Sequence, residues 1–129
     1  MKTFAFTVQG RAAPSLNGHL DRMKRLEAWY QEVREAIRTQ TGLPPQLVLS
    51  GAARAKLAAP LHLEPGERAT LRVTFHFKPS KVRTADMTNL TKSLEDSIFW
   101  DDYEVVRHEI AIDRQAKEDR VDVEVEVLR

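Results

Sequence analysis

The amino-acid sequence predicts an α+β fold with the element order βαβαββ, in which two helices pack mainly on one face of a mixed sheet. Four segments alternate apolar and polar side chains, as strands do, and two segments repeat apolar side chains at spacings of three and four, as amphipathic helices do. We find no internal repeat. The length of 129 residues predicts one domain that spans residues 1–129.

The composition narrows the function classes. No apolar run approaches the roughly 18 to 20 residues that cross a bilayer, so we expect no membrane partner. The chain has no cysteine, which excludes disulfides and thiolate zinc sites and fits a cytoplasmic location. A glycine-rich phosphate loop is absent from the sequence, so we expect no nucleotide cofactor.

The N-terminal half predicts one strand and one helix. The stretch TFAFTVQG, residues 3–10, alternates apolar side chains on one face and ends at a glycine. Residues 20–41 carry the helical pattern, and Gly42 with the two prolines that follow ends it. Residues 43–67 fit two descriptions, a short strand followed by a short helix, or an ordered loop or insertion.

The C-terminal half predicts a strand, a helix and two further strands. ATLRVTFHF, residues 69–77, alternates along its length, and residues 87–98 form the second helix. The last two strands, residues 103–112 and 119–128, are joined by a polar turn. In the final strand four valines alternate with carboxylates, which predicts a sheet covered on one side only. The apolar stripe of the second helix is expected to comprise Met87, Leu90, Leu94 and Ile98.

The net charge of +1 hides an asymmetry along the chain. Residues 1–83 hold 14 Lys/Arg against 6 Asp/Glu, whereas residues 84–129 hold 6 against 13. This division predicts a basic surface for a polyanion beside an acidic site, unless the two halves simply pair with each other.

The stretch from Arg83 to Val106 concentrates the acidic charge around a single lysine, Lys92. Carboxylates that converge in space repel each other unless a cation neutralises them, and hard oxygen ligands suit Mg²⁺ and metal-assisted phosphodiester hydrolysis. A solvated acidic surface is the alternative interpretation. The six carboxylates are Asp86, Glu95, Asp96, Asp101, Asp102 and Glu104.

The motif Asp86-x-Thr88-Asn89-Leu90-x-Lys92-x-x-x-Asp96, followed by Asp101-Asp102, resembles the signature of RusA-type Holliday-junction resolvases. That signature reads D-x-D-N-L-x-K-x-x-x-D, then D-D just before a strand. TFAFTVQG and TLRVTFHFKP also resemble the family's first strand and the strand before its motif, and the first helix and a closing two-strand ribbon match. Residues 43–67 have no counterpart.

The resemblance implies a homodimeric endonuclease that depends on Mg²⁺, with Mn²⁺ as an alternative ion. Such an enzyme resolves four-way DNA junctions by paired nicks in recombination and repair. By position, Asp86 and Asp102 would bind the metal, with Asp101 beside them in the metal site. Lys92 would contact the scissile phosphate or steady the attacking water.

Three further motif positions receive smaller roles. Asp96 would be an accessory member of the acidic group, and Asn89 would tie the preceding loop to the start of the helix. Thr88 stands where the family has a second aspartate, and a threonine there supplies no carboxylate and fits a helix N-cap. We hypothesise that Glu95 replaces the missing carboxylate; the alternative is weakened or abolished catalysis.

Two other classes of function remain open: a junction-binding protein that does not cleave, and a non-enzymatic α+β module whose acidic ribbon binds a basic protein. Phe99 and Trp100 fit either the core or a stacking contact with unpaired bases. His76 and His108 have no metal-binding spacing, and we assign them no catalytic role. The expected phosphate contacts to DNA are Arg11, Lys78, Lys81 and Arg83.

Overall fold

The computed structural model describes the whole chain except residues 1, 14–19, 45–46, 50–54, 80–86 and 101–104. The α+β prediction is confirmed as a mixed four-stranded sheet with two helices, but the predicted order lacked a short additional hairpin. In chain order the elements are β1 (Lys2–Gln9), α1 (Leu20–Thr41), β2 (Leu47–Leu49), β3 (Ala55–Leu57), β4 (Arg68–His76), α2 (Met87–Ile98), β5 (Val105–Asp113) and β6 (Arg120–Leu128).

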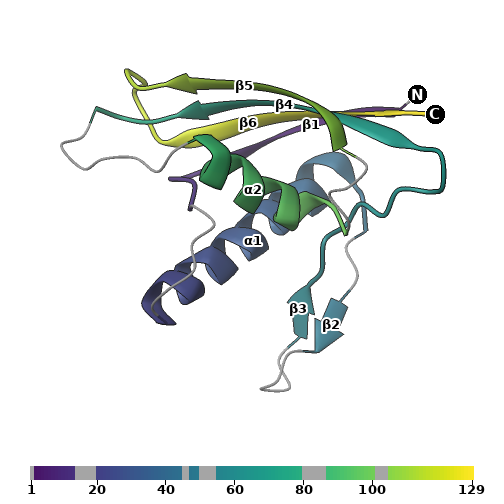
Figure 1. The fold of residues 1–129 in the computed structure, drawn as a ribbon. Helices are drawn as coiled ribbons and strands as arrows, with labels where there is room; N and C mark the ends of the chain where they lie inside the picture. The colour runs from purple at the N-terminus through teal and green to yellow at the C-terminus, as the bar shows by residue number, and fades with distance from the viewer. Residues whose placement is uncertain (1, 14–19, 45–46, 50–54, 80–86, 101–104) are drawn as a thin grey trace.

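The main sheet has the strand order β1-β6-β4-β5. β4 and β5 are parallel and are connected through α2, whereas β6 runs antiparallel to both of its neighbours, β1 and β4. Figure 1 shows both helices on the same face of this sheet, while the other face is open. The layer between sheet and helices is therefore the core.

The alternation in the sequence explains why one face is buried. In β6 the four valines from Val121 to Val127 are at most 3% exposed, while the residues between them are partly exposed. In β4, Leu71, Val73 and Phe75 are buried in the same layer. Because side chains alternate across a strand, each of these strands contributes one apolar face to the core.

The expected closing ribbon is wrong, because β5 and β6 do not pair with each other. They flank β4 on its two sides, and the turn between them crosses the end of β4. Phe77 holds this crossing in place: its N–H donates to the carbonyl of Asp113 at 2.8 Å, and its carbonyl accepts from the N–H of Ala116 at 3.2 Å. The strand β6 therefore lies between β1 and β4, and its valine face is buried in the core.

Residues 47–49 form the strand β2, which confirms the short strand of the first description, but residues 55–57 form the strand β3 where that description has a helix. β2 and β3 pair as a small antiparallel sheet, with Leu47 opposite Leu57. Gln31 of α1 adds to it, since its side-chain amide accepts from the N–H of Leu57 at 2.9 Å and donates to the carbonyl of Leu57 at 3.1 Å. These pairings outweigh the helix propensity of the alanine-rich segment.

A second glutamine of α1 pairs with the edge of the main sheet in the same way. The Gln40 side chain accepts from the N–H of Thr7 at 2.8 Å and donates to the carbonyl of Thr7 at 2.7 Å. β1 is an edge strand, so these backbone groups have no neighbouring strand on that side. The Gln40 side-chain amide thus makes the two hydrogen bonds that a residue of a further strand would make with Thr7.

Arg34 joins α1, α2 and the hairpin. Its guanidinium donates to the carbonyls of Asp96 and Ser97 at 3.0 Å each and to the carbonyl of Leu57 at 2.8 Å. The last carbonyls of a helix have no partner within the helix, so Arg34 satisfies two of those at the end of α2. Burial lowers the pKa of Arg34, although the charges of Tyr30 and Asp96 raise it.

The open face of the sheet is polar and densely paired. Arg72 on the central strand β4 contacts Glu109 and lies 3.0 Å from carboxylate oxygens of both Glu124 and Glu126. Hydrogen bonds with Glu126 and then Glu109 raise the pKa of Arg72. One guanidinium thus contacts three carboxylates from two neighbouring strands, and the cluster keeps an excess of negative charge.

A second cluster on the open face centres on His76. Its Nδ1 lies 3.1 Å from Asp113 and its Nε2 lies 2.9 Å from Asp122. A hydrogen bond from the Gln115 N–H, followed by the contact with His76, lowers the pKa of Asp113. Burial raises the pKa of Asp122, but hydrogen bonds from Thr7, His76 and Arg120 together outweigh it, so this pKa is also lowered.

We predict that Arg34→Ala lowers the free energy of unfolding by about 2–4 kcal/mol, because three carbonyls lose a charged donor. Arg34→Lys should recover only part of the lost stability. A single ammonium cannot donate at once to three carbonyls that each contact a different nitrogen of the guanidinium. Arg38→Ala is the matched control, because Arg38 is a half-exposed arginine of the same helix whose side chain pairs with the equally exposed Glu35. Urea unfolding measures all three variants, and equal losses for Arg34→Ala and Arg38→Ala would contradict the prediction.

The two aspartates around His76 predict a dependence of stability on pH. A carboxyl group whose pKa is lower in the folded protein stabilises the fold above its unfolded pKa of about 3.9, and this contribution disappears as the pH falls through the folded value. We expect the Asp113→Asn/Asp122→Asn variant to lose less stability than the unaltered protein between about pH 5 and pH 3. Urea unfolding at each pH, with Glu32→Gln as the control, tests this; equal slopes would argue against it.

Candidate functional site

Helix α2 carries the motif and begins at Met87. Leu90, Leu94 and Ile98 are at most 1% exposed, which confirms these members of the predicted apolar stripe. Met87 is 42% exposed, so its place in the stripe is wrong: as the first helical residue it lies beyond the layer that α2 shares with the sheet. Ser93 is also buried, and its hydroxyl donates to the carbonyl of Ala13 at 2.6 Å, which fastens the helix to the chain after β1.

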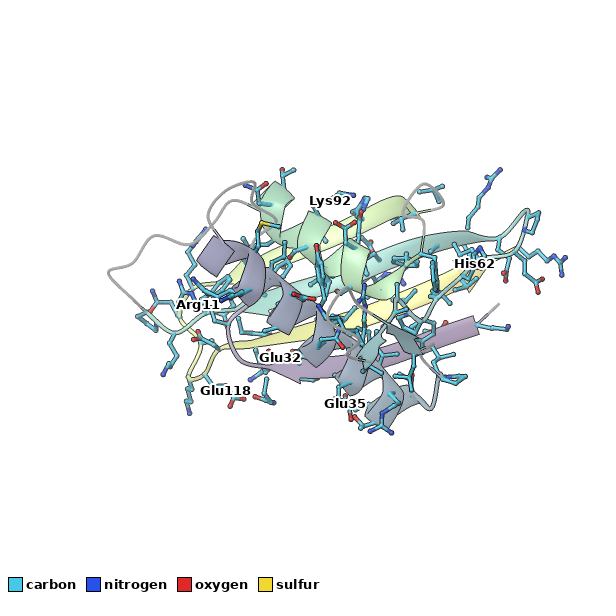
Figure 2. The ribbon with its side chains drawn as sticks, turned by 90° about the horizontal axis from the view of Figure 1, so that it is seen from below. Arg11, Glu32, Glu35, His62, Lys92 and Glu118 are labelled. Atoms are coloured by element: carbon cyan, nitrogen blue, oxygen red, sulfur yellow. The ribbon has the colours of Figure 1, made fainter. Side chains whose placement is uncertain are left out.

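The solvent side of α2 presents Lys92. This side chain is about half exposed, and its Nζ lies 3.0 Å from Asp96 Oδ1 one turn further along the helix. The other oxygen of Asp96 accepts a hydrogen bond of 3.5 Å from the hydroxyl of Tyr30 on α1. Burial and the nearby Asp96 charge raise the pKa of Tyr30. Figure 2 shows Lys92 on the outer side of the helix layer. The lysine is thus held by a carboxylate while it remains accessible.

Glu95 lies on the side of α2 that faces the sheet. It is only 7% exposed, and Glu95 Oε1 contacts Nε2 of His108 on β5. His108 pairs with Leu71 of β4 and precedes Ile110 and Ile112, which pack against the core from the same face of β5. The Glu95 carboxylate is therefore buried beside the core, whereas the His108 imidazole that contacts it is partly exposed on the edge strand β5.

Thr88 is exposed and is the second residue of α2, so it lies inside the first turn instead of at the predicted N-cap. Glu95 follows it by seven residues, which is about 10.5 Å along the helix axis. The two side chains also differ in surroundings, because Glu95 is buried against His108. For Glu95 to supply the carboxylate missing at Thr88, a metal would have to lie near His108 and not at the first turn.

The donor chemistry of the predicted metal site fits Mg²⁺, since it consists of carboxylate oxygens. Of the acidic group, the structure describes Glu95 and Asp96, and both have protein partners. Among the described residues no three metal-ligating side chains lie together. Five predicted site residues lie outside the described part of the chain: Asp86, Asp101, Asp102, Lys81 and Arg83.

The two described residues of the expected DNA contact lie at one end of the molecule. The Arg11 guanidinium sits 5.1 Å from the ring centre of Phe77, and Lys78 follows Phe77 directly in the chain. The Lys78 N–H donates to Asp119 at 2.9 Å, which fixes its backbone. Figure 2 shows Arg11 at the opposite end of the molecule from His62. Asn89 is partly buried in the first turn of α2.

The two aromatic residues after α2 differ in environment. Phe99 is 3% exposed and belongs to the core, as one of the two predicted interpretations has it. Trp100 is 47% exposed and is therefore not a core residue. Sequence reasoning also missed His108 as a partner of Glu95. The available signal was its position in the alternation: it shares the inward face of β5 with two isoleucines.

We predict that His108→Ala lowers the free energy of unfolding by roughly 1–3 kcal/mol, because it removes a partner of the buried Glu95 carboxylate. The double variant Glu95→Leu/His108→Leu should recover the stability, since two apolar side chains suit this layer without pairing. Urea unfolding of both variants measures the difference. A double variant less stable than His108→Ala would show that the pair stabilises the fold beyond its apolar replacement.

Neither described helix has a stretch long and apolar enough to cross a membrane. Comparison of the sequence with models of protein families and with curated proteins finds no match in either case.

Proposed function

We propose that this protein is a metal-dependent endonuclease that acts on branched DNA in the cytoplasm, as a homodimer with one site for each of two opposed strands. The observation that carries the proposal is the motif from Asp86 to Asp96, followed by the Asp101-Asp102 pair. The described half of that motif supports it, because Lys92 is exposed at the centre of α2 and a carboxylate holds its ammonium.

In this proposal Lys92 contacts the scissile phosphate, and its exposure on α2 supports that role. A phosphodiester that approaches the outer side of α2 meets the Lys92 ammonium, a compact charge that binds phosphate oxygens. Asp96 limits the positions of this ammonium through its 3.0 Å contact, and Tyr30 in turn limits Asp96. Charge placed in advance where negative charge develops is among the largest contributions to hydrolysis of this kind.

Asp86, Asp101 and Asp102 are the residues that would hold Mg²⁺ or Mn²⁺. A bound divalent cation would supply Lewis acidity and lower the pKa of a coordinated water. α2 separates Asp86 from the Asp101-Asp102 pair in the sequence, and its 12 residues extend about 18 Å. Metal titration tests whether Asp86 and Asp102 bind one ion or two.

We predict paired nicks in a labelled synthetic four-way junction when Mg²⁺ is present, and none without it. Asp86→Asn and Asp102→Asn should each abolish the nicks, and Lys92→Ala should slow them by about 10²–10³-fold through loss of a charge at the phosphate. Lys2→Ala removes an exposed lysine of β1 and serves as the control. Nicks that persist in Asp86→Asn would refute the assignment of the motif.

A non-cleaving junction-binding protein is the second candidate, and one observation favours it. Thr88 provides no carboxylate, while Glu95 is buried against His108 two turns away. Salt-sensitive binding to a four-way junction without nicks, in the presence of Mg²⁺ or Mn²⁺, would identify this function. Absence of any DNA binding would leave the third class, a protein-interaction module.

A further inference from the structure

Trp100 and His62 form an exposed pair of rings that two distant segments bring together. A parallel bridge between Leu61 and Phe99 positions them. The N–H of Leu61 donates to the carbonyl of Ile98 at 3.0 Å, and the N–H of Trp100 donates to the carbonyl of Leu61 at 3.0 Å. The backbone of Trp100 is thus fixed by a hydrogen bond directly after the end of α2.

Alternation at this bridge determines which side chains face solvent. Leu61 packs against the core and Phe99 is buried in it. The next residue on each segment, His62 and Trp100, therefore faces the other way, and both are exposed. Their ring centres lie 6.1 Å apart with the planes tilted by 38°. The result is a small aromatic surface whose position the backbone sets.

The exposure of Trp100 sets it apart from the other aromatic side chains. Among the large apolar residues that are exposed in the described part of the chain, Trp100 is the only aromatic one. The protein has one other tryptophan, Trp29, which is buried at 2% exposure. About half of the Trp100 side chain is thus exposed to water. Because a hydrogen bond to Leu61 holds its backbone, binding to this ring would cost little conformational entropy.

We propose that the Trp100–His62 pair is a stacking platform for one unpaired nucleobase. The inference rests on the proposed DNA-binding function and deepens it. Every base has a π face that stacks on an aromatic side chain, but in a duplex both faces are covered by neighbouring bases. A platform of two rings therefore selects unpaired bases, and a base pair that opens at the branch point of a four-way junction would supply one. Trp100 also directly precedes Asp101 and Asp102 in the sequence, which the proposed function places at the phosphate.

The two tryptophans make the test selective. Because Trp29 is buried, stacking of a base on the protein should quench the fluorescence of Trp100 alone. We expect a short single-stranded oligothymidylate to quench the emission, and a fully paired duplex of equal length to leave it nearly unchanged. The same experiment with Trp100→Ala should show no quenching by either.

Affinity for the same single-stranded probe is measured by the anisotropy of a labelled oligothymidylate. Trp100→Ala should weaken binding by about 5- to 150-fold, the usual range for loss of one stacked base, and Trp100→Phe should retain most of the affinity. His62→Ala should lie between them. Met23→Ala, which removes an exposed apolar side chain from α1, should bind as the unaltered protein does. Unchanged unfolding midpoints exclude loss of fold in each variant.

The outcomes separate this inference from the proposed function. Junction binding that is equal in Trp100→Ala and the unaltered protein, or equal quenching by the duplex, overturns the platform while the nuclease proposal stands. Quenching by single strands together with weaker oligothymidylate binding by Trp100→Ala, in a protein that makes no nicks, supports the platform and removes the nuclease activity. If the unaltered protein binds no DNA, both proposals fail.

Discussion

The packing of the helix layer depends on Arg34. At the end of helix α2 the residue Ser97 is fully buried, and the carbonyls of Asp96 and Ser97 lie beyond the last carbonyl that accepts a bond of the helical kind, that of Glu95 from Phe99. One guanidinium satisfies Asp96 and Ser97 and also Leu57 of the hairpin, so the end of α2, the centre of α1 and the chain leading to β4 share one donor. The planar fork of arginine suits this task because its nitrogens point in different directions. The position of Asp96, and through it that of Lys92, follows from the same contact.

The sheet separates two kinds of polar interaction. On its open face, Arg72 and His76 are surrounded by carboxylates from neighbouring strands, and water is close enough to reduce the cost of imperfect pairing. On its covered face, the Glu95 carboxylate is buried and contacts the partly exposed imidazole of His108 on the edge strand β5. Removing the imidazole would leave a buried carboxylate without this partner, which is costly.

Much of the fold was predictable because local patterns and tertiary packing agree. The range of α1 and the valine face of β6 follow directly from periodicity, and α2 has the predicted bounds. The hairpin at residues 47–57 was not predictable, because the alanine-rich segment favours a helix and the contact that decides otherwise comes from Gln31, far away in the sequence. Strand order was missed for a related reason: adjacent strands such as β5 and β6 usually pair, but here the end of β4 lies between them.

The candidate site was predictable only in part. Lys92 lies on the solvent side of its helix, away from the predicted apolar stripe. Glu95 shows the limit of such reasoning: it lies outside the predicted stripe, yet it is buried where β5 approaches and contacts His108. The exposure of Trp100 also depends on a partner, Leu61, that no pattern within the motif reveals. Distances between segments, which decide these cases, are not encoded in the spacing of residues along one segment.

The glutamine contact at Thr7 has a consequence for how copies of this protein can associate. A sheet that grows by adding strands from other molecules needs two accessible edges on each molecule, one to accept and one to offer a strand. Gln40 occupies backbone groups on the outer edge of β1, and a strand arriving there in register would have to displace both of its hydrogen bonds. Among the described residues, the strand at the other edge, β5, pairs only with β4. A molecule with one obstructed edge and one accessible edge can join a second copy through its β5 strands, but such a pair has no equivalent edge left for further growth. The same amide that completes β1 therefore disfavours fibres and leaves closed pairs accessible.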